Sequence, residues 1–382
     1  MTTVLARLVR LLVAVVFTWP VSIAPAAEPI KIGAVLPFSG GVELYGAQAK
    51  LGLDLAVKEI NAAGGVAGRP LTILYEDDRT DPQAAEQATR KLIEREGVLA
   101  VIGPITSRNL NAMKPLAERA KTPLLYATNY EGGACGRYVF VFSSVPNQEL
   151  AQLLPYMDRT FGNTYYLLGA DRAWPHKMFE AAEPIIARLG GRVVGKEFTK
   201  GTETDFGPLI DRIAATRAKV LVFALKGDGL SFIPQASDRG LMRQTATAFL
   251  GLSEADLPVF HGKGRDMFVV VPLVAASADP AVKAFVTRAR GEAGAGTIVS
   301  NYVMTHYNAV VALKAAVEKA GRVDREALVD ALEGLVIPSP TGPVTIGKDH
   351  HVTMSMFLAK TEGTTMVQVR ALGPIAPESG CK

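Results

Sequence analysis

Hydrophobic and polar residues follow two different periods along this chain, and the two periods take turns. Short apolar runs typical of strands, such as 30–36, are followed by longer stretches such as 44–63, where Leu51, Leu55 and Ile60 fall near one helical face. Strands that alternate regularly with helices indicate a parallel sheet covered by helices. The pattern therefore predicts an α/β protein.

The alternation continues along almost the whole chain. We expect strands at 30–36, 71–75, 98–102, 123–127, 164–169, 192–197, 219–224, 246–250 and 268–273, with β-rich hairpins at 344–372. Helices are expected at 44–63, 82–95, 107–120, 147–159, 175–189, 204–216, 229–239, 280–290, 301–320 and 324–333. The two halves show the same alternation, which suggests two similar lobes.

The N-terminus has the three parts of a secretory signal. Arg7 and Arg10 are followed by the apolar run 11–17 and by small residues at Ala24-Pro25-Ala26, where cleavage is expected. The apolar run falls short of the roughly 20 residues that span a bilayer. We therefore expect residues 1–26 to be a cleaved signal peptide leading to the periplasm, with an uncleaved anchor as the alternative. The mature protein is expected to be soluble.

Charge and cysteine content narrow the function classes. The chain has 41 basic and 37 acidic residues, and residues 1–26 carry two arginines and no acids, so 39 basic residues remain. This balance argues against nucleic acid as a partner, because phosphate binding needs clustered cations. Cys135 and Cys381 are the two cysteines. In an oxidising compartment they either pair or stay as two free thiols, which sequence does not decide.

Two adjoining segments carry a family resemblance. The strand and loop at 30–40 precede a helix that ends in Val57-Lys58-Glu59-Ile60-Asn61-Ala62-Ala63-Gly64-Gly65-Val66-Ala67-Gly68-Arg69-Pro70-Leu71. This order is similar to the opening of the type 1 periplasmic solute-binding proteins, the family of the leucine/isoleucine/valine-binding protein. The resemblance implies two doubly wound parallel-sheet lobes joined by a three-segment hinge, with crossovers near 143–147, 272–276 and 340–346. It also implies no catalysis and no cofactor.

With these crossovers each lobe is discontinuous in sequence. The first lobe is expected to hold residues 27–145 and 274–342, and the second to hold 146–273 and 343–382. In such sheets ligands bind at the carboxyl ends of strands, where helix N-termini present free backbone donors. Ligand would enter a cleft between the lobes, and closure of the hinge would bury it.

Loops after two first-lobe strands contain candidate ligand-binding residues. Thr106 and Ser107 follow strand 98–102, where each serves either as a helix cap or as a ligand contact. Tyr126 and Thr128 end strand 123–127 and combine an aromatic ring with a hydroxyl, although Tyr126 also suits the core. Residues 126–132, 146–148, 169–175, 252–255 and 340–344 together resemble the branch that binds urea and short-chain amides. That resemblance implies that Ser107, Tyr126 and Thr128 contact ligand.

The second lobe departs from the amide-binding pattern. Amide binders tend to show Asp-Tyr-x-Tyr/Phe-Pro where this chain has Asp171-Arg172-Ala173-Trp174-Pro175. Trp174 can still cover the ligand, whereas Arg172 introduces a fixed cation that favours carboxylates. Lys226 adds a second cation at the next strand end. The alternative for both cations is a solvated position on the rim.

Other chemistry finds little support. His350 and His351 are neighbours on a strand and point to opposite faces, so no metal site is expected. Residues 251–255 lack the closing glycine of a nucleophile elbow. We therefore expect a monomeric substrate-binding component of an ABC importer, with permease subunits as partners and urea, a short amide, an amino acid or a small carboxylate as ligand. A periplasmic sensor of the same fold is the alternative, and an exported hydrolase is a weaker one.

Overall fold

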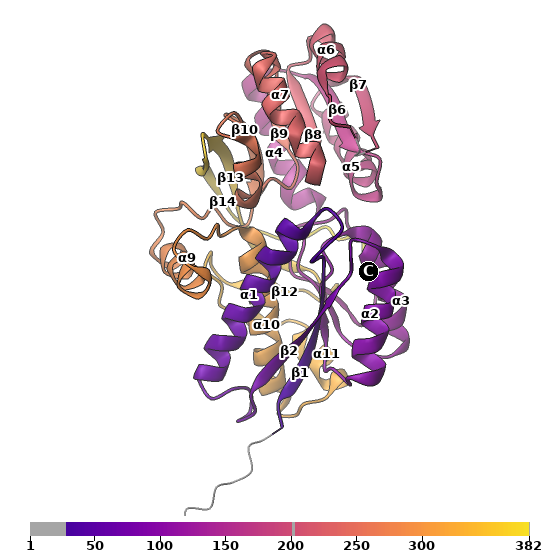
Figure 1. The fold of residues 1–382 in the computed structure, drawn as a ribbon, viewed down its shortest axis with the longest axis vertical. Helices are drawn as coiled ribbons and strands as arrows, with labels where there is room; N and C mark the ends of the chain where they lie inside the picture. Colours follow the sequence, from indigo (N-terminus) through magenta and orange to yellow (C-terminus); the bar gives the residue numbers. More distant parts are fainter. Residues whose placement is uncertain (1–27, 201–202, 382) are drawn as a thin grey trace, which may run out of the picture.

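The computed structural model describes residues 28–200 and 203–381 of the 382-residue chain. They form two α/β lobes, which lie one above the other in Figure 1. The expected signal peptide lies outside the described residues. Two lobes built around separate sheets confirm the fold class predicted from the alternation of strands and helices.

The first lobe is built on five parallel strands in the order β2-β1-β3-β4-β5. β1 pairs with β2 along its whole length, and the edge strand β5 is buried on both faces. Near-continuous apolar runs are what a parallel sheet covered on both faces requires. The strands are β1 (Ile30–Leu36), β2 (Leu71–Asp77), β3 (Val101–Ile102), β4 (Leu124–Tyr126) and β5 (Val139–Val141).

Helices cover both faces of this first sheet. α1 packs against α10 on one face, and α2 packs against α3 on the other (Figure 1). The helices are α1 (Glu43–Ala62), α2 (Pro82–Arg90), α3 (Ser107–Arg119), α9 (Pro280–Ala293), α10 (Asn301–Ala320) and α11 (Arg325–Leu332). Asp81 caps α2 through Gln83 and Ala84, as expected from the Asp-Pro pair at its start. A π-helical turn, Lys91–Arg95, extends α2.

The second lobe has a mixed sheet. Its parallel part runs β7-β6-β8-β9-β10, and β10 then pairs antiparallel with β13. The strands of this lobe are β6 (Thr164–Ala170), β7 (Arg192–Thr199), β8 (Val220–Ala224), β9 (Ala246–Phe249), β10 (Met267–Val271), β13 (Val352–Glu362) and β14 (Thr365–Ile375). The short strands β11 (Val336–Ile337) and β12 (Val344–Ile346) pair with each other, and β12 joins the sheet through β13. The helices are α4 (Pro146–Phe161), α5 (Ala173–Arg188), α6 (Gly207–Thr216), α7 (Phe232–Asp238) and α8 (Leu241–Gln244), with 3₁₀ turns at Gly227–Ser231 and Glu254–Phe260.

The chain passes between the lobes three times. It crosses after β5, after β10 and again between β12 and β13, and Figure 1 shows β12 beside α10 of the first lobe and both β10 and β13 in the second lobe. The expected lobe boundaries at 145/146, 273/274 and 342/343 stay a prediction. After β14 the tail returns to the first lobe, so the last residues belong spatially with the loop that follows β4.

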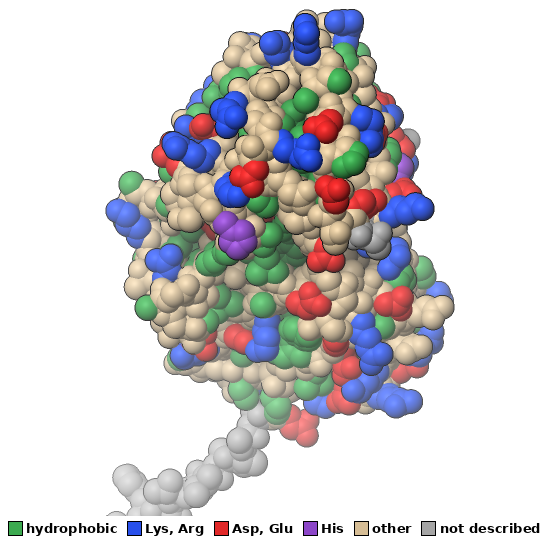
Figure 2. All heavy atoms as spheres, turned by 45° about the horizontal axis from the view of Figure 1, so that its top comes forward, with side chains coloured by type: hydrophobic (Ala, Val, Ile, Leu, Met, Phe, Trp, Pro, Cys, Tyr) green, Lys and Arg blue, Asp and Glu red, His purple; other side chains and the backbone are tan. Residues whose placement is uncertain are grey.

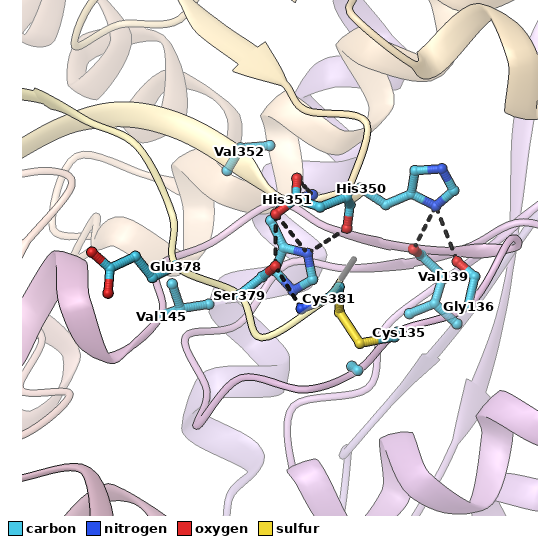
Figure 3. Close-up of polar contacts among 12 residues, drawn as sticks. Cys135, Gly136, Val139, Val145, His350, His351, Val352, Glu378, Ser379 and Cys381 are labelled. Atoms are coloured by element: carbon cyan, nitrogen blue, oxygen red, sulfur yellow. Dashed lines mark hydrogen bonds and ion pairs between the residues drawn. A yellow bond between two sulfur atoms is a disulfide. The ribbon is translucent and has the colours of Figure 1, made fainter.

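The tail is held there by a disulfide and by hydrogen bonds. Cys135 and Cys381 are joined, with their Cα atoms 5.4 Å apart (Figure 3). The Gly133 amide donates to the Ser379 carbonyl at 2.8 Å, and the Ser379 hydroxyl donates to Asp349 at 2.6 Å. These contacts tie the loop 130–136, which adjoins the ligand-site loop, to the last crossover between the lobes.

His350 and His351 occupy that same crossover. His350 Nδ1 lies 3.1 Å from the Gly136 carbonyl and 3.2 Å from the Val139 carbonyl (Figure 3). The His350 ring also stacks on Phe140. His351 Nε2 lies 2.5 Å from the Tyr130 hydroxyl. Both imidazoles therefore connect the last crossover to the first lobe. The described part of the chain holds no group of three or more His, Cys, Asp or Glu side chains arranged for a metal ion.

Candidate ligand-binding site

A cavity of about 490 Å³ lies between the lobes. Its walls come from residues at the carboxyl ends of strands in both lobes, together with two tyrosines from α1 and α10. The first-lobe residues are Gly40, Gly41, Val42, Tyr45, Thr80, Ile105, Thr106, Ser107, Arg108, Thr128, Asn129 and Tyr302; the second-lobe residues are 170–175, 224–229 and Gly251. Figure 2 shows hydrophobic side chains gathering where the two lobes meet, with charges of both signs mixed over the rest of that face. A concave site with apolar walls and a few polar groups is typical of small-molecule binding.

The N-terminus of α3 forms one polar wall of the cavity. Thr106 caps the helix, because its hydroxyl accepts a hydrogen bond from the Asn109 amide at 3.3 Å. Ser107 is buried, and its hydroxyl donates to Glu131 at 2.6 Å. Burial raises the pKa of the Glu131 carboxyl. Thr106 and Ser107 both line the cavity, so the residue that caps this helix also forms part of the cavity wall.

Thr128 and Tyr126 take different positions after β4. Thr128 is buried and lines the cavity, with its hydroxyl 3.5 Å from the Pro104 carbonyl. Tyr126 lies behind the wall, where its hydroxyl donates to the Ile105 carbonyl at 3.0 Å and burial raises its pKa well above the ordinary value. Tyr126 therefore supports the loop that carries Ile105 and does not line the cavity. Its predicted contact with ligand stays untested.

Arg172 and Trp174 come from the loop between β6 and α5. Arg172 is exposed at the N-cap of α5 and lines the cavity, and its guanidinium has no hydrogen bond or ion pair with the residues that the structure describes. Trp174 is partly buried and packs against first-lobe side chains as well as those of its own lobe. Its indole nitrogen is buried without a hydrogen-bond partner among the described residues. The ring therefore bridges the lobes beside the cavity.

Lys226 is held inside the wall by second-lobe acceptors. Its ammonium donates to the Gly251 carbonyl at 2.6 Å and to Asp256 Oδ2 at 2.9 Å. Tyr45 of α1 donates to Asp256 Oδ1 at 2.5 Å, and the Lys226 ammonium lies 4.9 Å from the centre of the Tyr45 ring. Tyr45 belongs to the first lobe, so this cluster joins the two lobes at the cavity wall.

Several of these functional candidates were not expected from sequence. Tyr45 and Asp256 lie 211 positions apart in the sequence. The local pattern around Tyr45 is that of an ordinary helix face, and the pattern around Asp256 is that of a polar turn. Gly227 has φ +59, and a Cβ atom there would lie 2.8 Å from the Gly41 carbonyl of the other lobe. The paired glycines at 40–41 and the Gly-Asp-Gly at 227–229 were the available signals for this close approach.

Two buried glutamates lie behind the site, near the crossovers. Glu149 accepts a hydrogen bond from Ser144 at 2.5 Å, and burial raises its pKa to about 7. Glu254 accepts from the Ala275 amide at 2.8 Å, and burial likewise raises its pKa to about 7. Neither residue lines the cavity. Both carboxyl groups are therefore expected to titrate nearer to neutrality than an exposed glutamate.

The fold and this two-lobed cavity define a solute-binding protein, and comparison with known proteins agrees. Residues 29–365 match the sequence profile of the periplasmic binding proteins, so the chain belongs to the periplasmic binding protein family. Within residues 28–200 and 203–381, no helix is both long enough and apolar enough to cross a membrane. The family relationship makes this chain a periplasmic binding protein and gives no support to an enzyme.

Curated relatives are of the branched-chain amino acid type. The chain is 29% identical over 353 residues to the Leu/Ile/Val-binding protein BraC3 of Rhizobium johnstonii, which covers 87% of this chain and 92% of the relative. It is 23% identical over 343 residues to the leucine-, isoleucine-, valine-, threonine- and alanine-binding protein of Pseudomonas aeruginosa, covering 88% and 90%. Neither is named for urea or amides, so the resemblance to that branch stays a prediction.

Solved structures share the fold. A solute-binding protein of an ABC transporter from R. palustris, in complex with benzoate, superposes with a TM-score of 0.83 at 23% identity, covering 93% of this chain and 99% of that one. The branched-chain amino acid binding protein LivJ from Streptococcus pneumoniae, in complex with isoleucine, gives 0.81 at 20% identity, covering 91% and 100%. At these identities the likeness speaks for the fold alone.

Proposed function

We propose that this protein is the periplasmic substrate-binding component of an ABC importer and captures a small solute that carries a carboxylate. The observation that carries the proposal is the cavity between the lobes, whose walls come from both of them. A ligand that contacts both walls stabilises the closed arrangement, because it binds that arrangement better than the open one. Permease subunits in the membrane would then receive the loaded form.

The charges around the cavity support a carboxylate. Three cationic side chains line it, namely Arg108, Arg172 and Lys226. The N-terminus of α3 adds backbone donors, which favour anions at such positions. Arg172 is the cation with no partner among the described residues, so its planar guanidinium is free to bind a carboxylate in a bidentate manner.

The known ligands of related proteins point the same way. Relatives are named for branched-chain amino acids, and structures of the same fold were solved with benzoate or isoleucine. Amino acids and benzoate share the carboxylate and an apolar body. Urea and short amides lack that charge, and for them an unpaired arginine in the wall offers no particular advantage.

A binding screen tests the proposal. Ligand-stripped, refolded protein would be mixed separately with urea, acetamide, leucine, isoleucine and benzoate. Its thermal unfolding would then be monitored to obtain the melting temperature with each compound. We expect carboxylates to raise the melting temperature and Arg172→Gln to weaken that effect. A rise with urea or acetamide alone would return the protein to the amide branch, and no rise with any of them would refute the proposed ligand class.

A further inference from the structure

The wall around Lys226 presents a positive charge to the cavity and hides the matching negative charge. The Lys226 side chain keeps 19% of its surface exposed, whereas that of Asp256 is completely buried. Lys226 lines the cavity and Asp256 does not. Of the two partners, Lys226 therefore lies nearer to an entering ligand, and the carboxylate lies behind it.

The Asp256 carboxylate is fully buried and offers no exposed oxygen to a ligand. Oδ1 accepts from Tyr45, while Oδ2 accepts from Lys226 and from the Ser253 amide at 2.8 Å. The Gly251 carbonyl at the same wall is also used by Lys226. The ammonium group of Lys226 thus already binds the acceptors of this wall that could otherwise hold the ammonium group of a ligand.

The acidic side chains that do line the cavity lie at its mouth. Asp171 is 64% exposed and pairs with His176 at 2.8 Å, and Asp228 is exposed on the loop after β8. Glu131 stands behind Ser107 and outside the lining residues. Arg108 and Arg172 are exposed as well, so Lys226 is the least exposed charged side chain of the lining, and no carboxylate accompanies it in the buried part of the cavity.

We propose that Lys226 is a specificity-determining residue that excludes ligands with an α-ammonium group, so that the ligand is an organic acid with an apolar body and no amino group. The inference rests on the proposed function and narrows its ligand class. Like charges in a partly desolvated wall repel strongly, and a buried ammonium group needs acceptors that this wall has already used. Tyr45, Trp174 and Tyr302 supply the aromatic surface on which the apolar body packs.

Matched ligand pairs test the proposal. Isothermal titration calorimetry would compare 4-methylpentanoate with L-leucine and 3-phenylpropanoate with L-phenylalanine, since each pair differs only in the amino group. We expect the acid without the amino group to bind at least about tenfold more tightly in both pairs. This factor corresponds to the cost of burying one ammonium group of the ligand without a hydrogen-bond partner. Equal affinities, or tighter binding of the amino acids, would overturn the proposal and leave the proposed function standing.

Variants separate the role of Lys226 from a general effect. Lys226→Gln should reduce the preference for the acids several-fold, whereas Arg172→Gln should weaken both members of a pair alike. Lys263→Gln is the matched control, because Lys263 pairs with Asp238 on the surface of the same lobe, outside the cavity. A preference that survives Lys226→Gln in folded protein would overturn the assignment. If no member of either pair binds wild type, the proposed ligand class itself fails.

Discussion

Tyr45 makes the hydrogen bond that most directly links the lobes at the cavity. Its hydroxyl, on α1 of the first lobe, donates to Asp256 of the second lobe at 2.5 Å, and both groups are buried. When the lobes separate in the proposed opening movement, this bond must lengthen or break. Tyr45→Phe removes the hydroxyl and keeps the ring that packs against Tyr302. The change should therefore weaken the closed state selectively.

The size of the effect follows from the remaining partners of Asp256. A hydrogen bond to a charged group contributes about 1.5–3 kcal/mol net. In the Tyr45→Phe variant Asp256 keeps Lys226 and the Ser253 amide, so its charge is not left without partners. We therefore expect the lower end, about 1.5 kcal/mol, which corresponds to about tenfold in ligand affinity.

Rates of ligand exchange give the sharpest measurement. Trp19 and Trp174 are the two tryptophans of the chain, so Trp174 is the only one left once residues 1–26 are removed, and it stands at the cavity wall. Stopped-flow fluorescence should show ligand dissociating about tenfold faster in Tyr45→Phe, with little change in the association rate. Tyr307→Phe is the control, because its hydroxyl donates to Glu59 at 2.7 Å within the first lobe. Unchanged dissociation, or an equal effect in the control, would refute the reasoning.

Three further predictions concern the wall, the tail and the crossovers. Thr128→Ala should lower ligand affinity several-fold in calorimetry while the melting temperature changes little; unchanged affinity would remove Thr128 from the site. Reduction of the Cys135–Cys381 disulfide, or Cys381→Ala, should lower the free energy of unfolding by about 2–5 kcal/mol in denaturant titrations, and equal stability with and without reductant would contradict this. The pKa of Glu149 rises from 4.5 to about 7 on folding, so the folded state binds the proton more tightly and stability falls as pH increases from about 4.5 to 7, by at most about 3 kcal/mol. Glu149→Gln should flatten that pH profile, and an unchanged slope would assign it to other groups.

The elements with the strongest periodicity were predictable from sequence. The strand expected at 30–36 and the helix expected at 301–320 have those bounds in β1 and α10, because buried apolar residues recur along their whole length. β5 was missed, since three apolar residues in a loop-like context carry almost no periodic signal. The strand expected at 98–102 is reduced to Val101–Ile102, although the Leu99 amide still donates to the Lys31 carbonyl.

The candidate site was predictable in position more than in detail. The rule that ligands bind at the carboxyl ends of parallel strands located the loops that carry Thr128, Trp174 and Lys226, and all three line the cavity. Tyr126 ends the same strand that leads to Thr128, yet it points behind the wall. β4 ends at Tyr126, so the strand's alternation of side chains no longer applies at Thr128, and sequence alone does not show which way either side chain turns there.

Local sequence also does not show whether a charged side chain is already paired within the protein or is free to bind a ligand. Arg172 and Lys226 look alike as cations at neighbouring strand ends, but Lys226 is neutralised by an acid 30 positions away and Arg172 has no partner among the described residues. The pair at Lys226 fills the acceptors of the wall and keeps one cationic face towards the cavity, whereas Arg172 keeps its full bidentate capacity. Affinity for a carboxylate should therefore depend mainly on Arg172, and rejection of an amino group mainly on Lys226. Because these two effects arise from different partners, single substitutions should separate them.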